Sequence, residues 1–232
     1  MTSAPLPTLP ENPSLLTRIK IGYKALKAAK EDPGNPIAGA LINDCFEQEV
    51  YARLVEEMRQ HPDGKTLLEE RPSMQAEDVD LDAWWALPEG TLGRELAQYY
   101  EDHQIEPFST DQPLRNDVDY VSKRYRETHD IYHLLTGYGT DVMGEMQLQA
   151  FVRGNLGIRA PLMILPFAFL SAKFGKEDSD DAPLELGEYM HKVRAAQKRG
   201  ATIEPLIHIR FEDHMARPIK ELRQMFLDGE AP

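Results

Sequence analysis

The sequence is nearly without cysteine: Cys45 is the only one among 232 residues. A single thiol cannot form a disulfide within the chain or supply a cysteine-cluster metal site. We therefore exclude a disulfide-stapled secreted scaffold and expect a reducing, cytoplasmic environment. The sequence also lacks a run of the ~18–20 apolar residues that a membrane-spanning helix needs. The nearest candidate, residues 160–170, is short and contains Pro161 and Pro166. We expect a soluble or peripheral protein.

Basic residues are also scarce relative to acidic ones, 26 against 39, which gives a formal net charge of −13. Because phosphate groups are neutralised by a basic surface, this balance excludes general nucleic-acid binding. The same acidic excess gives the chain as a whole no electrostatic help at an anionic membrane surface. The hydrophobic fraction of 41% is ordinary for a globular protein.

Apolar residues recur at helical spacing along most of the chain, and no series of strands is evident. We expect an all-α fold, with a single-domain helical bundle over residues 15–232 that contains a metal-binding helical hairpin. A flexible, proline-rich tail, which does not resemble a signal peptide, precedes it at residues 1–14. The expected helices cover residues 15–29, 36–59, 65–70, 91–103, 118–135, 141–153, 184–199 and 218–227, and residues 205–211 are expected to be extended.

One segment combines residues that bind metals. His129 and His133 are four residues apart, so on a helix their imidazoles lie on one face. Asp130 borders the same face. Two imidazoles and a carboxylate form a donor set suited to Zn²⁺, Fe²⁺ or a similar divalent ion.

A fourth donor follows a glycine-containing turn. Glu145 lies twelve residues after His133, and in an antiparallel hairpin its carboxylate can face the histidine pair. Thr140 or Asp141 is expected to cap the returning helix. Four such ligands leave room for water or substrate on a five- or six-coordinate ion. The alternative is a salt-bridged pair of helices, which the spacing alone does not exclude.

The string His-Asp-x-x-His, eleven residues and then Glu145 resembles the signature of the coenzyme Q biosynthesis family Coq-four. The similarity extends over roughly residues 35–228. It includes Tyr125–Asp130, Leu135–Gly137, Gly144–Glu145, Leu87–Gly93, Arg71–Pro72 and Phe211–His214. The chain departs from the usual pattern at Gln149, where a lysine is common, and at Val152, where an acidic residue is common.

This resemblance implies a mostly helical fold, a metal held by His129, Asp130, His133 and Glu145, and a role in ubiquinone biosynthesis. The implied reaction is an oxidative decarboxylation, in which the C1 carboxylate of a polyprenylated 4-hydroxybenzoate intermediate is removed and a hydroxyl is placed there. The implied partners are this prenylated aromatic intermediate and other ubiquinone biosynthesis proteins. A homodimer and peripheral membrane contact are both compatible with the sequence.

Two arginines precede the histidines by about one turn. Arg124 or Arg126 could bind the leaving carboxylate of the substrate as a bidentate pair, which would make them catalytic candidates. The alternative is that both form ordinary surface ion pairs. The apolar residues 162–170 could line a groove for the prenyl tail, although a place in the buried core is the commoner explanation.

Two other functional classes compete with a metal-dependent enzyme. One is a non-catalytic, lipid-binding scaffold that organises the ubiquinone biosynthetic complex and holds a structural metal. The other is a His-Asp phosphohydrolase, which needs an additional upstream histidine and a distal aspartate. His103 fits that place poorly, because the immediate His133 and the spacing to Glu145 do not match that class.

Overall fold

The computed structural model describes residues 13–31, 36–110, 113–160 and 185–227, together with Pro7, Leu9 and Pro10. In these parts every regular element is a helix, which confirms the all-α prediction. The α-helices are α1 (Leu15–Glu31), α2 (Pro36–Phe46), α3 (Gln48–Gln60), α4 (Pro62–Glu70), α5 (Leu81–Trp85), α6 (Leu92–His103), α7 (Asp117–Glu127), α8 (His129–Thr136), α9 (Val142–Leu156), α11 (Leu186–Ala201) and α12 (Ile219–Phe226). Two short 3-10 helices are η1 (Leu206–His208) and η2 (Phe211–His214).

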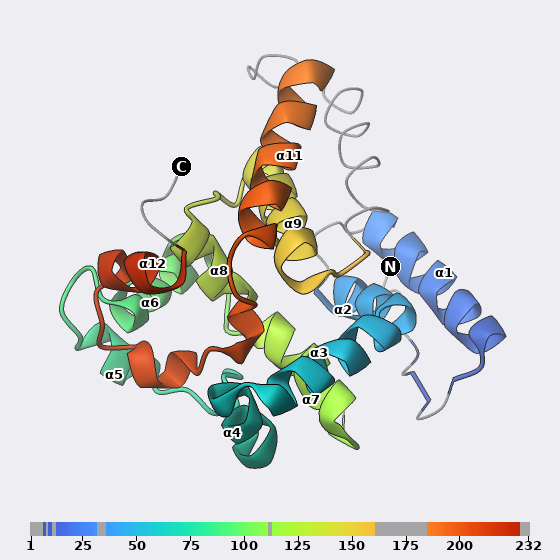
Figure 1. The fold of residues 1–232 in the computed structure, drawn as a ribbon, viewed down its shortest axis with the longest axis horizontal. Coiled ribbons are helices and arrows are strands. Elements are labelled where there is room, and N and C mark those ends of the chain that lie inside the picture. The colour runs from blue at the N-terminus through green and yellow to red at the C-terminus, as the bar shows by residue number, and fades with distance from the viewer. Residues whose placement is uncertain are drawn as a thin grey trace.

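The helices form one bundle with an extended arm (Figure 1). The arm is the pair α9 and α11, which pack closely against each other and rise above the rest. Helix α1 packs on α2 at one side of the bundle, whereas α5, α6 and α12 lie at the opposite side. Helices α7 and α8 pass between these two sides, so the segment that carries the histidines is central.

Two helices expected to be continuous are each divided in two. The expected helix over residues 36–59 breaks at Glu47, whose buried carboxylate accepts the backbone N–H groups of Arg159 and Ala160. The expected helix over residues 118–135 breaks at Thr128, whose hydroxyl donates to the carbonyl of Arg124 at 2.9 Å. A side chain that bonds back to the preceding turn bends a helix there. Because of this break, α8 begins at His129 as a separate helix and does not continue the axis of α7.

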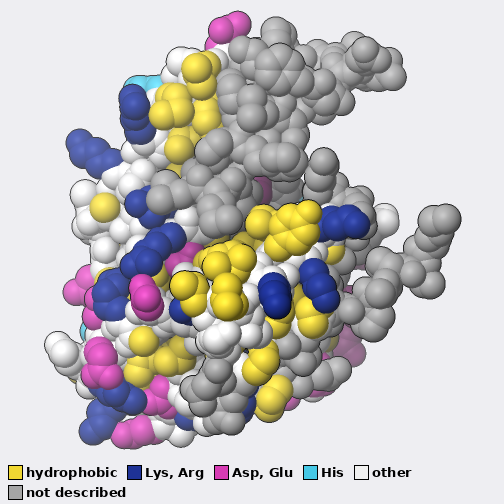
Figure 2. Space-filling model, turned by 90° about the vertical axis from the view of Figure 1, so that its right-hand side faces the viewer, with side chains coloured by type: hydrophobic (Ala, Val, Ile, Leu, Met, Phe, Trp, Pro, Cys, Tyr) yellow, Lys and Arg dark blue, Asp and Glu magenta, His cyan; other side chains and the backbone are white. Residues whose placement is uncertain are grey.

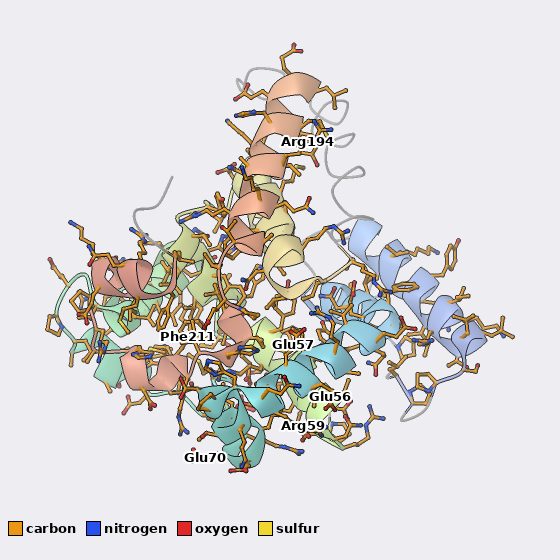
Figure 3. All side chains as sticks on the ribbon, in the orientation of Figure 1. Glu56, Glu57, Arg59, Glu70, Arg194 and Phe211 are labelled. Atoms are coloured by element: carbon orange, nitrogen blue, oxygen red, sulfur yellow. The ribbon has the colours of Figure 1, made fainter. Side chains whose placement is uncertain are left out.

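The C-terminal region differs from the sequence expectation. Residues 205–211, expected to be extended, contain η1 and lead into η2. Asn155 on α9 holds the connection that precedes η1: its Nδ2 donates to the carbonyls of Gly200 and Glu204, and its Oδ1 accepts from the backbone N–H of Leu206. Phe211 of η2 points into the bundle, where its ring meets that of Tyr132 edge-on (Figure 3). The segment that contains η1 and η2 thus packs against α8 on the face that carries Tyr132.

Across the described ranges, none of the helices has the length and apolar character required to traverse a bilayer. The apolar segment 162–170, predicted to line a groove for the prenyl tail or to lie in the core, falls outside the described residues.

Candidate metal centre

Helices α8 and α9 are joined by a short turn where the sequence predicts a metal-binding hairpin, and metal binding there stays a prediction. His129 and His133 lie one turn apart on α8, and Glu145 lies in the first turn of α9. The turn between them starts at Gly137, whose φ of 76° ends α8 in the left-handed conformation that favours glycine. Asp141 then caps α9, since its Oδ1 accepts from the backbone N–H groups of Met143 at 2.9 Å and Gly144 at 3.1 Å. Of the two expected caps, the structure uses Asp141.

The absence of a side chain at position 144 sets the distance between the turn and α9. A Cβ atom at Gly144 would lie 2.2 Å from the carbonyl oxygen of Gly139, well inside van der Waals contact. Only glycine lets the start of α9 approach the turn this closely. Glu145, the next residue, is thereby held against α8.

The three side chains converge. One ligand atom each from His129, His133 and Glu145 can be chosen so that all lie within 4.8 Å of one another. The Nε2 atom of His133 is 3.1 Å from Oε2 of Glu145, and Nε2 of His129 is 3.8 Å from Oε1. The His133 side chain is 5% exposed, that of His129 23% and that of Glu145 41%, so a ligand can reach the cluster from the Glu145 side.

The orientation of His133 is fixed through its other nitrogen. Nδ1 of His133 lies 3.0 Å from the carbonyl oxygen of Tyr138, which accepts its proton. This hydrogen bond directs the other ring nitrogen, Nε2, at the carboxylate of Glu145. The Tyr99 ring stacks on His133 with a centroid distance of 6.1 Å and packs on His103 at 4.3 Å. The backbone carbonyl behind His133 is one of the partners that the second nitrogen of metal-binding histidines usually has.

Asp130, predicted as a fourth ligand, lies on a different side of His129. Its Oδ1 is 3.7 Å from Nδ1 of His129, whereas Nε2 of that ring faces Glu145. The three-residue cluster does not include Asp130. A carboxylate behind a ligating histidine orients the ring and raises its basicity. The geometry thus brings together three of the four predicted ligands and sets Asp130 behind one of them.

The electrostatics of the cluster favour positive charge beside the carboxylates. Burial raises the pKa of Glu145, but the hydrogen bond to His133 and the nearby imidazoles outweigh it and bring that pKa to about 2. Burial lowers the pKa of His129, but the Asp130 and Glu145 carboxylates more than offset it, so the net shift is upward. A group of this kind suits a divalent cation, which can replace the imidazole proton.

Gln149 is a site residue to which the sequence assigned no role. Its Nε2 donates to Oε1 of Glu145 at 2.7 Å and lies 3.5 Å from Nε2 of His129. Gln149 is four residues after Glu145 on α9, and this spacing places the two side chains on one face. The i, i+4 relation was therefore a signal available in the sequence.

The two arginines predicted to be catalytic are engaged elsewhere. Arg124 is fully buried, and its guanidinium donates to both carboxylate oxygens of Glu212 and, at 2.9 Å, to the carbonyl of Ile209. Arg126 donates to both oxygens of Asp44, each at 3.0 Å. Neither pair is an exposed surface pair, because the Arg124 side chain is fully buried and those of Arg126 and Asp44 are both under a tenth exposed. Substrate binding by these arginines stays a prediction.

The chain is similar to known proteins in sequence and in fold. The chain is 29% identical over 209 residues to a zebrafish (Danio rerio) protein named as a mitochondrial ubiquinone biosynthesis protein COQ4 homolog, covering 88% of this chain and 74% of the relative. The bovine (Bos taurus) homolog of the same name is 26% identical, with 94% of this chain and 81% of that one covered. A crystal structure from Nostoc punctiforme, provisionally described as a ubiquinone biosynthesis protein, superposes with a TM-score of 0.72 at 24% identity, over 93% of this chain and 99% of that one. At this identity the likeness concerns the fold.

The sequence pattern of one family spans nearly all of the described structure. That family is described as coenzyme Q (ubiquinone) biosynthesis protein Coq4, and its match covers residues 15–227. The chain therefore belongs to the Coq4 family of ubiquinone biosynthesis proteins, as the resemblance in the sequence implied.

Proposed function

We propose that this chain is a metal-dependent enzyme of ubiquinone biosynthesis that replaces the C1 carboxylate of a polyprenylated 4-hydroxybenzoate intermediate by a hydroxyl. The observation that supports this most is the convergence of His129, His133 and Glu145 within 4.8 Å, with one side open to a ligand. Three protein ligands with an accessible position are typical of catalytic rather than structural metal sites.

The donor set fits a divalent ion such as Zn²⁺ or Fe²⁺. Two imidazole nitrogens and one carboxylate oxygen would come from His129, His133 and Glu145. When bound, the metal would supply a Lewis acid for a phenolate or carboxylate oxygen or, if it is iron, a site for dioxygen chemistry. Asp130, whose Oδ1 is 3.7 Å from Nδ1 of His129, would favour the orientation of that ring by its charge, whereas a hydrogen bond to the Tyr138 carbonyl holds His133.

The reaction must also balance. The bond between ring C1 and the carboxylate carbon breaks, the carboxylate leaves as CO₂, and one atom of O₂ forms the new C1–O bond. The second oxygen atom leaves as water, which requires two electrons and three protons per substrate carboxylate. A reductant must supply these two electrons, because the conversion of the carboxylate into CO₂ and a ring hydroxyl itself supplies only two of the four electrons that O₂ accepts.

A cation beside the substrate carboxylate would orient it before it leaves. Arg124 and Arg126 remain the proposed candidates, and each would have to exchange part of its present bonding to Glu212 or Asp44 for the substrate. Gln149 offers a neutral donor beside Glu145 at the place where family members commonly carry lysine. Other ubiquinone biosynthesis proteins are the proposed partners that deliver the substrate and receive the product.

The test is release of labelled CO₂ from a prenylated 4-hydroxybenzoate carrying ¹³C in its carboxylate, with O₂ and a reductant present. The purified protein, the His129→Ala/His133→Ala variant and a His191→Ala control are compared. His191 is exposed on α11, so its loss controls for the removal of a histidine. We expect release by the first and the third protein, and at least a ~100-fold decrease for the double variant.

The outcome also separates the enzyme from the scaffold. Metal bound by the unaltered protein and lost from the double variant, without labelled CO₂ from either, would contradict the enzymatic proposal. That result would favour the lipid-binding scaffold with a structural metal.

A further inference from the structure

Helix α1 exposes an unusual amount of apolar surface. Four of its side chains are largely open to solvent: Leu15 is 64% exposed, Leu16 70%, Ile19 48% and Tyr23 70%. They make up half of the large hydrophobic side chains that are exposed among the described residues, the others being Ile105, Val142, Leu186 and Met225. Single exposed apolar residues are normal, but a cluster on one element marks an interaction surface.

The four exposed side chains occupy one face of α1, and the opposite face of this helix packs against the protein. At ~100° per residue, the four side chains fall within an arc of about 100°. On the opposite face Ile21 and Ala25 are buried in the core, and α1 packs along α2. The exposed face is therefore presented by the fold and is not the frayed end of an unpacked helix.

Basic side chains border the apolar face. Lys20 and Lys24 are exposed and follow it on one flank of the same helix. Helix α1 contains Arg18, Lys20, Lys24, Lys27 and Lys30 against the single acid Glu31, a net charge of five minus one, or +4. The chain as a whole carries −13, so the other residues together carry −13 minus 4, or −17. Figure 2 views this side of the molecule, and hydrophobic and basic side chains lie interspersed over α1.

We propose that α1 docks on an anionic lipid surface, lying in the plane of the interface with its apolar face among the acyl chains. Seventeen residues give a helix about 25 Å long with one apolar face, the form of an interfacial helix. Leu15, Leu16 and Ile19 enter the acyl boundary, while Lys20 and Lys24 extend to lipid headgroups.

The charge pattern selects the occupant of this surface. A second copy of the chain packed on the same face would bring two lysine flanks together, and like charges oppose such a symmetric contact. An anionic membrane pairs with the lysines and buries the apolar side chains at once. This surface is independent of the metal cluster, and a failure of either proposal leaves the other standing.

The test is flotation of the purified full chain with vesicles of phosphatidylcholine alone and with vesicles containing equal parts of phosphatidylcholine and phosphatidylglycerol. We expect binding to the anionic vesicles that decreases in high salt. Leu16→Ser/Ile19→Ser is expected to weaken the partition at least about tenfold. Lys20→Glu/Lys24→Glu is expected to weaken it about tenfold or more on the anionic vesicles.

Two matched variants serve as controls. Ile105→Ser/Met225→Ser removes two large exposed apolar side chains, one just after α6 and one on α12, on the opposite side of the bundle. Lys198→Glu/Lys220→Glu makes the same charge change on α11 and α12. We expect both controls to bind vesicles like the unaltered chain, and circular dichroism to show equal helix content in all four variants.

Three results would overturn the proposal. The first is no binding of the unaltered chain to anionic vesicles, and the second is equal weakening by the α1 variants and their controls. The third is unchanged vesicle binding in the α1 variants together with a shift from dimer to monomer in light scattering, which would make this face an interface between copies. A Tyr23→Ser variant, altered at a side chain that is 70% exposed, repeats the test with little risk to folding.

Discussion

The Nε2 atom of His133 lies 3.1 Å from Oε2 of Glu145, and this contact joins the two helices of the hairpin at the point where a metal is proposed to bind. Nδ1 of His133 donates a hydrogen bond to the Tyr138 carbonyl, and Gln149 donates one to the carboxylate of Glu145. Both groups are therefore preorganised, and a metal requires little rearrangement of either one.

Asp130 is expected to act on metal affinity through His129. Because its carboxylate faces Nδ1 of His129, Asp130→Asn should weaken metal binding about 10- to 100-fold without abolishing it. Glu145→Gln removes a direct ligand and should weaken binding more. Competitive titration against a chelator measures both constants. A larger loss for Asp130→Asn than for Glu145→Gln would show that Asp130 is itself a ligand.

Gly144→Ala is expected to disturb the centre without changing any ligand. The added methyl meets the backbone of Gly139, so α9 must shift away from the turn and Glu145 must move with it. We expect a stability loss of about 1–3 kcal/mol and at least a roughly tenfold weaker metal affinity.

The matched control is Gly187→Ala, since a Cβ atom there meets no other atom within 4 Å. Its unfolding free energy should stay within about 0.5 kcal/mol of the unaltered chain. Urea unfolding and metal titration of both variants test this pair. If Gly144→Ala bound metal as tightly as the control, the close approach of α9 to the turn would be irrelevant to the site.

Arg124 is expected to be essential for stability. Arg124→Ala would leave the Glu212 carboxylate without the guanidinium that it now binds, and loss of one partner of such a buried pair costs about 3–5 kcal/mol. Arg217→Ala breaks an exposed pair with Glu221 and should cost less than about 1 kcal/mol. Urea unfolding compares the two. An Arg124→Ala variant of normal stability that has lost turnover would instead support the substrate-binding role.

His208 should make the fold sensitive to acid. Burial and the facing His61 ring, whose centroid is 4.9 Å away, lower the pKa of His208 below its usual 6.5. The unfolded chain then binds the proton more readily than the folded chain. The stabilisation is thus complete above about pH 6.5 and decreases as the pH falls through the unfolded value.

The His208→Phe variant keeps a ring against His61 and removes this titration. Its unfolding free energy should depend less on pH between about 7 and 5 than that of the unaltered chain. His191→Phe, on the exposed face of α11, should leave the dependence as it was. If the unfolding free energy of His208→Phe depended on pH as that of the unaltered chain does, His208 would not contribute to the acid sensitivity.

The sequence predicted the parts of the site that depend on local spacing. The i, i+4 relation of His129 and His133, the glycine turn and the Asp141 cap are all encoded within a few residues, and the structure contains each of them. The break at Thr128 was not predicted, because a threonine inside a helical pattern shows no sign of whether its hydroxyl bonds back to the chain.

Contacts between distant segments could not be predicted in this way. Nothing near Arg124 in the sequence indicates Glu212, which is 88 residues further on. For Arg124 the sequence suggested either substrate binding or a surface ion pair, and the buried pair with Glu212 was not among the alternatives. The extended piece expected over residues 205–211 was wrong for a similar reason, since Asn155 on α9 holds the turn before η1. Tertiary hydrogen bonds outweigh local preference in both places.

The most direct measurement is the metal content of the purified chain beside His133→Ala and the control His191→Ala, by elemental mass spectrometry after gel filtration. We expect about one divalent ion per chain in the unaltered protein and the control, and little or none in His133→Ala. Equal metal in all three proteins, or none in any, would contradict the claim that His129, His133 and Glu145 form a metal centre.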